Sequence, residues 1–325
     1  MKRLFNIKRT KMVDELAFGH NPMAFGKSFL AFFLISIIVN VATNTLTNTP
    51  ILLDYLVKSI ASGKFTSLTE MLIEFLESPY VTLPWWSTPL QLLGGVFAIV
   101  AVSIYIKKFE KRKISAVGVR KGGALVEILL GALIGGALIG AMFAITLFSG
   151  AISYTFVGFD IRILLYALGF AVFAFGEELL VRGFFMNVLA RDMKPMTAII
   201  ISALLHAISG FSLYNITSFI NTLVFGIFLG VFVFKRGSIW GSAAIRFMWS
   251  FVGCSILGTT VFGSYPIISL LIPKYNEPAI LSGSTSYGFE YGLIMTALLI
   301  VATLLVLLLK TKKSEESFVK IEYFN

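Results

Sequence analysis

Two adjacent glutamates and an arginine inside a long apolar stretch have the residue types and spacing best suited to chemistry. Glu177 and Glu178 stand side by side, and Arg182 follows Glu178 by four residues. On a helix, Glu178 and Arg182 share a face and can neutralise each other, whereas Glu177 points about 100° away. Glu177 could then act as a general base on water. Alternatively, the three residues form a buried ionic network that joins helices.

The composition indicates that this motif lies in a membrane. The chain has 325 residues, of which 57% are hydrophobic and 14% are charged, and soluble domains do not carry such an excess of apolar residues. Apolar runs of roughly 18 or more residues recur, and each is long enough to cross a hydrocarbon core of about 30 Å as a helix. A carboxylate there is costly, so Glu177 and Glu178 need partners or a water-filled cavity.

We therefore predict an all-α fold, a polytopic bundle of about eight transmembrane helices. The spans are expected at 29–46, 89–106, 124–149, 161–181, 196–213, 216–234, 239–262 and 288–309. With both termini in the cytoplasm, every basic cluster falls on the cytoplasmic side, as the positive-inside rule requires. These clusters are Lys2 to Lys11, Lys107 to Lys113, Arg191 with Lys194, Lys235 with Arg236, and Lys310 to Lys313. We expect a multi-pass protein of the cell membrane.

Three regions follow from these spans. Residues 1–110 form an N-terminal anchor region with two spans and an external segment, 111–262 form the core, and 263–325 hold an external loop, the last span and a cytoplasmic tail. The external segment 47–88 contains prolines, the pair Trp85 and Trp86, and a short amphipathic stretch at 68–76. The segment 263–287 is predicted to be a flexible loop. Glycines in the third span, at 131, 135, 136 and 140, favour close helix packing.

Several classes of function are disfavoured. The net charge of +10 does not indicate a nucleic-acid partner, because the basic residues flank membrane spans and do not gather on a soluble surface. The single cysteine, Cys254, provides neither a disulfide framework nor a cysteine metal site. Ser250 has no neighbouring base of the kind that serine hydrolases use. We find no inverted repeat typical of transporters.

The segment Phe175 to Phe184, FGEELLVRGF, resembles the E-E-x-x-x-R-G motif of the CPBP family of intramembrane metalloproteases, which includes CAAX-protease, Abi and lysostaphin-resistance-protein-A-like members. The resemblance spans roughly 110–255, with support from 199–205, from Phe225, Gly226 and Gly230, and from 237–240. It implies a CAAX-protease-like helix bundle in a bacterial membrane. It also implies a mechanism in which the first motif glutamate activates water, aided by two histidines and an asparagine that bind a metal or stabilise the oxyanion.

The later motifs of that family are degenerate in this chain. Its second-motif histidine falls on Gly210, and its third-motif histidine and asparagine fall on Arg246 and Ser250. Glycine has no ligand atom, and arginine has only donors. His206 lies one helical turn from Gly210 and is the candidate for a displaced histidine that substitutes for it. We therefore expect no metal, with zinc only if the chain is an active protease, and hypothesise that Arg246 pairs with Glu177.

Two functions remain open. In the first, the chain is a pseudoprotease that acts as a scaffold or regulator of another membrane or envelope protein, and His206 is a satisfied polar residue of the core. In the second, it is an active metal-dependent endopeptidase that processes a CAAX-type, lipidated or bacteriocin-like peptide. The machinery would then be Glu177, Glu178, Arg182 and His206. In both, the lipid bilayer is a partner and nucleic acid is not.

Overall fold

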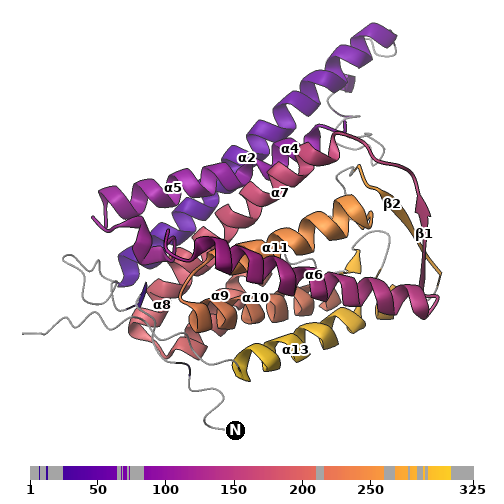
Figure 1. Ribbon diagram of the computed structural model, residues 1–325. Helices are drawn as coiled ribbons and strands as arrows, with labels where there is room; N and C mark the ends of the chain where they lie inside the picture. Colours follow the sequence, from indigo (N-terminus) through magenta and orange to yellow (C-terminus); the bar gives the residue numbers. More distant parts are fainter. Residues whose placement is uncertain are drawn as a thin grey trace, which may run out of the picture.

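The described residues form an all-α bundle with a short two-stranded ribbon at one end (Figure 1). The structure is a computed structural model that describes residues 7, 12–13, 25–63, 67, 69–71, 73, 84–209, 216–259, 268–276, 279–283, 288–289 and 292–308. One continuous hydrophobic core contains side chains from all three predicted regions, from Phe32 through Phe184 to Leu299. The prediction of an all-α membrane bundle is confirmed.

Each predicted span corresponds to a helical segment of the structure. The segments are α2 (Phe25–Ser62), α4 (Ser87–Leu92) with α5 (Gly94–Lys108), α6 (Ala124–Phe148), α7 (Ile163–Glu178), α9 (Pro195–Ser209), α10 (Ile216–Arg236), α11 (Trp240–Phe251) and α13 (Leu293–Leu308). Among the described residues, five helical stretches are long and apolar enough to cross a membrane, and α9 and α13 are shorter apolar helices. Helix α11 packs against α6, α7 and α10, which places it inside the bundle.

Two of these helices continue directly into π-helices. Helix α7 is followed by η2 (Leu179–Phe185) and then α8 (Met186–Asp192), and α11 is followed by η3 (Val252–Ile256). A π-turn widens the backbone and shifts its hydrogen-bond pattern, and such turns are frequent at functional sites. The buried side chain of Asn187, at the start of α8, donates hydrogen bonds to the η2 carbonyls of Gly183 at 2.6 Å and Arg182 at 3.3 Å. The wide turn is therefore held by a side chain as well as by the backbone.

Glycines allow the helices around α7 and α11 to approach backbone to backbone. A Cβ added at Gly176 would lie 2.3 Å from the carbonyl oxygen of Gly95 on α5. In the third span, a Cβ at Gly131 would lie 2.1 Å from the Gly241 carbonyl, and Gly135 is similarly close to Ile245. The predicted close packing is confirmed for Gly131 and Gly135. It does not extend to Gly140, where a Cβ would meet open space.

The first helix is longer than the sequence indicated. Span 29–46 was expected to end before an irregular external segment, but α2 continues through Pro50 to Ser62 and extends away from the bundle (Figure 1). Proline removes one backbone donor from a helix. The helix continues because its neighbouring residues pack: Ile51 is buried, and Thr47 donates a hydrogen bond to Gln91 of α4 at 3.0 Å. Most of 64–83, including the larger part of the amphipathic stretch, lies outside the described residues.

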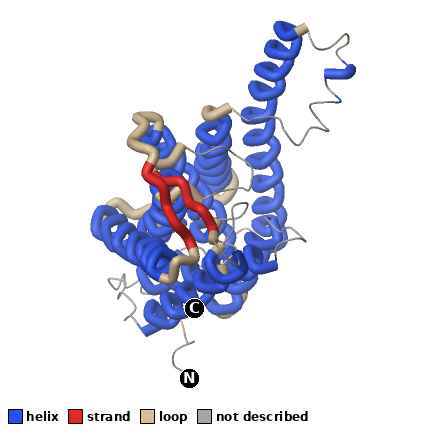
Figure 2. The backbone as a smooth tube through the Cα atoms, turned by 90° about the vertical axis from the view of Figure 1, so that its right-hand side faces the viewer, coloured by secondary structure: helices blue, strands red, loops and turns tan. Residues whose placement is uncertain are grey.

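The second correction concerns the segment predicted as a flexible loop. Within it, β2 (Leu271–Tyr275) pairs antiparallel with β1 (Ile152–Phe156), with Ile152 opposite Tyr275 and Phe156 opposite Leu271 (Figure 2). A short helix, α12 (Ala279–Ser282), follows. Five-residue strands, one of which contains a proline, give a weak local signal. The pairing requires 152–156 and 271–275 to lie on one side of the membrane, as the eight-span topology places them.

At the opposite end of the bundle, several predicted cytoplasmic loops meet. The short helix η1 (Ile114–Val117) follows the basic cluster 107–113, and beyond it the Arg120 carbonyl accepts a hydrogen bond from the Trp240 indole at 2.9 Å. Arg236 forms a bidentate pair with Glu127 at the start of α6. Lys235 donates a hydrogen bond to the Leu307 carbonyl at the end of α13. The clusters at 2–11 and 310–313 lie outside the described residues.

The glycine contact between α5 and α7 yields a direct test. We expect Gly176→Ala to lower the free energy of unfolding by about 1–3 kcal/mol, because the new methyl group would overlap the Gly95 backbone. The same substitution at Gly140 is the matched control. It should leave stability unchanged or raise it by up to about 1 kcal/mol, because alanine favours helix and meets no neighbour there. Thermal unfolding in detergent measures both, and equal melting temperatures for the two variants would contradict the contact.

Candidate functional site

The candidate site lies where α7, α9 and α11 meet. Glu177 and Glu178 end α7, Arg182 lies in η2, His206 is in the last turn of α9, and Arg246 is in the middle of α11. Gly176 is the residue before Glu177 and contacts α5 through its backbone. The close approach of α5 therefore fixes the end of α7 from which both carboxylates extend.

Glu178 and Arg182 form the neutralising pair that their spacing predicted. The Arg182 Nη1 atom lies 3.1 Å from Glu178 Oε1, and the two side chains are only 1% and 0% exposed. Each ion is costly to bury alone, and their mutual attraction offsets much of that cost. The pair joins the last turn of α7 to η2. Glu177 is therefore the carboxylate that remains to contact other helices.

Glu177 makes two contacts through a single carboxylate oxygen. Arg246 Nη2 lies 2.5 Å from Glu177 Oε1, and His206 Nε2 lies 2.9 Å from the same atom. Arg246 Nη2 and His206 Nε2 are themselves 3.4 Å apart. The hypothesised pairing of Glu177 with Arg246 is present in the structure. Two side chains from two other helices thus converge on one oxygen of Glu177, and we call Glu177, His206 and Arg246 the charged cluster.

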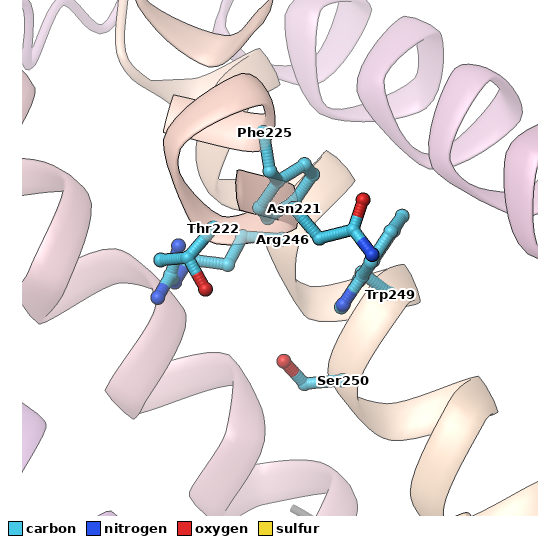
Figure 3. A pocket seen from close by; sticks show the side chains of 6 residues that line it. All are labelled: Asn221, Thr222, Phe225, Arg246, Trp249 and Ser250. Atoms are coloured by element: carbon cyan, nitrogen blue, oxygen red, sulfur yellow. The ribbon is translucent and has the colours of Figure 1, made fainter. Parts of the chain in front are cut away.

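Arg246 is further positioned by aromatic side chains of α10 and α11. Its guanidinium carbon lies 5.8 Å from the centre of the Phe225 ring, and Phe225 stacks on Trp249 at 4.4 Å. A pocket of about 40 Å³ lies beside it, large enough for a few water molecules. Figure 3 shows that Arg246 extends away from Ser250 across this pocket. The six lining residues are Asn221, Thr222, Phe225, Arg246, Trp249 and Ser250.

The sequence-predicted residues thus fall into two groups. Glu177, Glu178, Arg182, His206 and Arg246 meet around the ends of α7 and α9, whereas Ser250 lies one helical turn beyond Arg246. Gly210 lies outside the described residues. Sequence reasoning missed the roles of Asn187, which holds the π-turn, and of Phe225 beneath Arg246. An asparagine inside an apolar helix was the available signal for Asn187.

The side chains of the charged cluster do not fit the metal site that the family resemblance implies. A zinc site takes three or four nitrogen, sulfur or oxygen ligands. The cluster offers Glu177 Oε1 and His206 Nε2, and a guanidinium, which has only donors, contacts both. Across the residues that the structure describes, no group of three or more His, Cys, Asp or Glu side chains is arranged to hold a metal ion.

The buried Glu178 and Arg182 pair yields a prediction about stability. Replacing one partner leaves the other charge buried without compensation, so Glu178→Gln should cost about 3–5 kcal/mol of unfolding free energy. The double variant Glu178→Leu with Arg182→Met removes both charges and should recover most of that loss. Chemical denaturation in detergent gives the values. If Glu178→Gln unfolds at the parent's denaturant concentration, the pair does not neutralise a buried charge.

Comparison with known proteins identifies one family. Residues 158–252 match the family model described as Type II CAAX prenyl endopeptidase Rce1-like. None of the curated proteins matches the chain. The matched segment runs from the loop before α7 into the start of η3 and contains the Glu178 and Arg182 pair and all three residues of the charged cluster. The chain is therefore a membrane protein in which residues 158–252 form a CAAX-protease-like region, similar to the Rce1-like family.

Proposed function

We propose that this protein is a pseudoprotease, a catalytically silent CAAX-protease-like protein that acts as a scaffold or regulator of another membrane or envelope protein. The observation that carries the proposal is the contact of Arg246 with Glu177 at 2.5 Å. A general base must contact the water that it deprotonates. Glu177 Oε1 instead contacts the guanidinium of Arg246 and the imidazole of His206.

The charge arrangement supports a structural role for these residues. Glu177 and Glu178 carry two negative charges, and Arg246 and Arg182 carry two positive charges, so the four side chains are neutral as a set. A network of paired charges can be accommodated among apolar helices, whereas a single unpaired one is costly. The contacts also join α7, α9 and α11. In this proposal Glu177 joins helices and does not act as a general base.

The same proposal covers location and partners. We place the protein in a bacterial cell membrane, with both termini in the cytoplasm, the lipid bilayer around the bundle and no resident metal. The partner would be another membrane or envelope protein. The basic residues of the described cytoplasmic loops and the meeting of those loops at one end of the bundle support this orientation.

A second candidate function has one observation in its favour. The other carboxylate oxygen of Glu177, Oε2, is buried and has no hydrogen-bond partner within the described part of the protein. Buried polar atoms of this kind commonly bind an ordered water molecule. A water held at Oε2 would be the nucleophile of the alternative, an active intramembrane endopeptidase with Glu177 and His206 as its residual machinery.

A combined metal and cleavage assay separates the two functions. We expect the purified protein to contain less than one equivalent of zinc and to leave prenylated CAAX peptides and lipidated peptides uncleaved in proteoliposomes. Added zinc should not change this result. The paired variants Glu177→Ala and His206→Ala serve as controls for background proteolysis. Stoichiometric zinc, together with cleavage by the parent that both variants abolish, would replace the proposal by the endopeptidase.

The structural role of Arg246 has its own test. Glu177→Ala should lower the unfolding free energy by about 1–3 kcal/mol, because Arg246, whose side chain is 14% exposed, then lies largely buried without a counter-charge. Combining Glu177→Ala with Arg246→Met should cost less than the sum of the two single variants, with a coupling energy of about 0.5–3 kcal/mol. Denaturant unfolding of the four proteins in one detergent gives the cycle. If the changes in unfolding free energy of the two single variants simply add in the double variant, the contact between Glu177 and Arg246 does not contribute to stability.

A further inference from the structure

The segment 156–161, which joins β1 to α7 and which we call the interfacial loop, exposes large apolar side chains. Phe156, Val157, Phe159 and Ile161 are between 55% and 69% exposed. Such a concentration on one short loop marks an interaction surface, since isolated exposed apolar residues are normal but contiguous ones are not. The loop lies at the end of the bundle that carries the ribbon (Figure 2).

This exposed surface continues directly onto a helix that spans the membrane. Leu164, Leu165 and Leu168 of α7 are also exposed. These three leucines lie on one face of α7, and Ile161, in the turn just before the helix, continues the same spacing of i, i+3, i+4 and i+7. The opposite face of α7 packs inside the bundle through Tyr166 and Phe170, which are buried. The exposed apolar face of α7 and the apolar side chains of the interfacial loop therefore form one continuous surface.

A charged pair at the junction of the interfacial loop with α7 limits how deep the loop can lie. Arg162 Nη2 lies 2.5 Å from Asp160 Oδ2, and the Arg162 guanidinium stands 5.1 Å from the centre of the Trp85 ring. The hydrogen bonds from Arg162 hold the pKa of Asp160 at about 2, well below its usual range, so Asp160 is ionised at neutral pH. Tyr166 donates a hydrogen bond to the Trp85 carbonyl at 2.7 Å. These contacts fix Trp85 above the start of α7.

We propose that the interfacial loop inserts into the outer leaflet of the bilayer, with Phe159 and Ile161 among the acyl chains and Asp160, Arg162 and Trp85 at the level of the headgroups. Ions stay out of hydrocarbon, and tryptophan concentrates at the interface, so this chemistry fits a lipid surface. Apolar and charged residues alternate from 159 to 162, so this segment lies along the boundary between the acyl chains and the headgroups. On the outer face of the ribbon, the exposed pair of Ser153 and Lys274 remains in water, whereas the next pair, Thr155 and the exposed Ile272, lies closer to the interfacial loop.

This placement locates the charged cluster within the membrane. Glu177 lies 14 residues beyond Ile163, the first residue of α7, by subtraction of their numbers. At 1.5 Å per residue this is about 21 Å along the helix axis. In a hydrocarbon core of about 30 Å, the charged cluster then lies roughly 9 Å from the inner boundary. The inference rests on the membrane fold and is independent of whether Glu177 is catalytic.

Nitroxide labels test the insertion. Cys254, the single native cysteine, is buried, and Cys254→Ala provides a background without a labelling site. Phe159→Cys and Ile161→Cys place labels on the loop, and Ser153→Cys and Lys274→Cys are matched controls on the outer face of the adjacent ribbon. Each is labelled in the full-length protein in nanodiscs of phosphatidylcholine and phosphatidylglycerol, and its collisions with oxygen and with a water-soluble nickel chelate are measured.

We expect oxygen collisions to dominate at 159 and 161 and nickel collisions to dominate at 153 and 274. Nickel dominance at 159 and 161 would show that the loop lies in water and would overturn the proposal. Low collision rates with both reagents at 159 and 161 would show that protein covers the loop, which would also overturn it. Neither result depends on zinc content or peptide cleavage, so failure here is distinguishable from failure of the pseudoprotease proposal.

Discussion

Two adjacent carboxylates inside an apolar helix bundle must each find a positive partner, and the arrangement of the site follows from this requirement. The two glutamates cannot share one partner, because neighbouring side chains on a helix point about 100° apart. Glu178 is neutralised within its own segment by Arg182, at 3.1 Å. Glu177 is neutralised across the bundle by Arg246 of α11, at 2.5 Å. The first pair is local, and the second ties two helices together.

The packing of the bundle serves this arrangement. The glycine contact of α5 with α7 fixes the end of α7, and the glycines of α6 bring its backbone against α11, from which Arg246 extends. The π-turn of η2 carries Arg182 and is held by Asn187. Phe225 supports the guanidinium of Arg246 from α10. The cluster therefore depends on close helix approaches that a single added methyl group would disturb.

Charges are paired at both ends of α7, at the candidate site and at the membrane surface. In a CAAX-protease-like site a metal ion beside the glutamate would activate water. Here the cation beside Glu177 is the Arg246 side chain, which cannot bind a metal or lose its proton. Arg246 provides the positive charge that offsets the buried carboxylate of Glu177. At the other end of α7, Asp160 and Arg162 pair at the surface, so the helix carries paired charges at both ends and an apolar face between them.

The sequence by itself determined the membrane class, the eight helical segments and the pair of Glu178 with Arg182, which follow from composition, run length and helical spacing. Arg246 as the candidate partner of Glu177 came instead from the family resemblance, which places Arg246 where the third motif has a histidine. Only the tertiary structure decided that His206 contacts Glu177 at 2.9 Å, that α2 continues through Pro50, and that β1 pairs with β2. His206 and Glu177 are 29 residues apart by number, and the strands are more than 100 apart. No local pattern encodes such contacts, because they arise only when separate helices pack into one core.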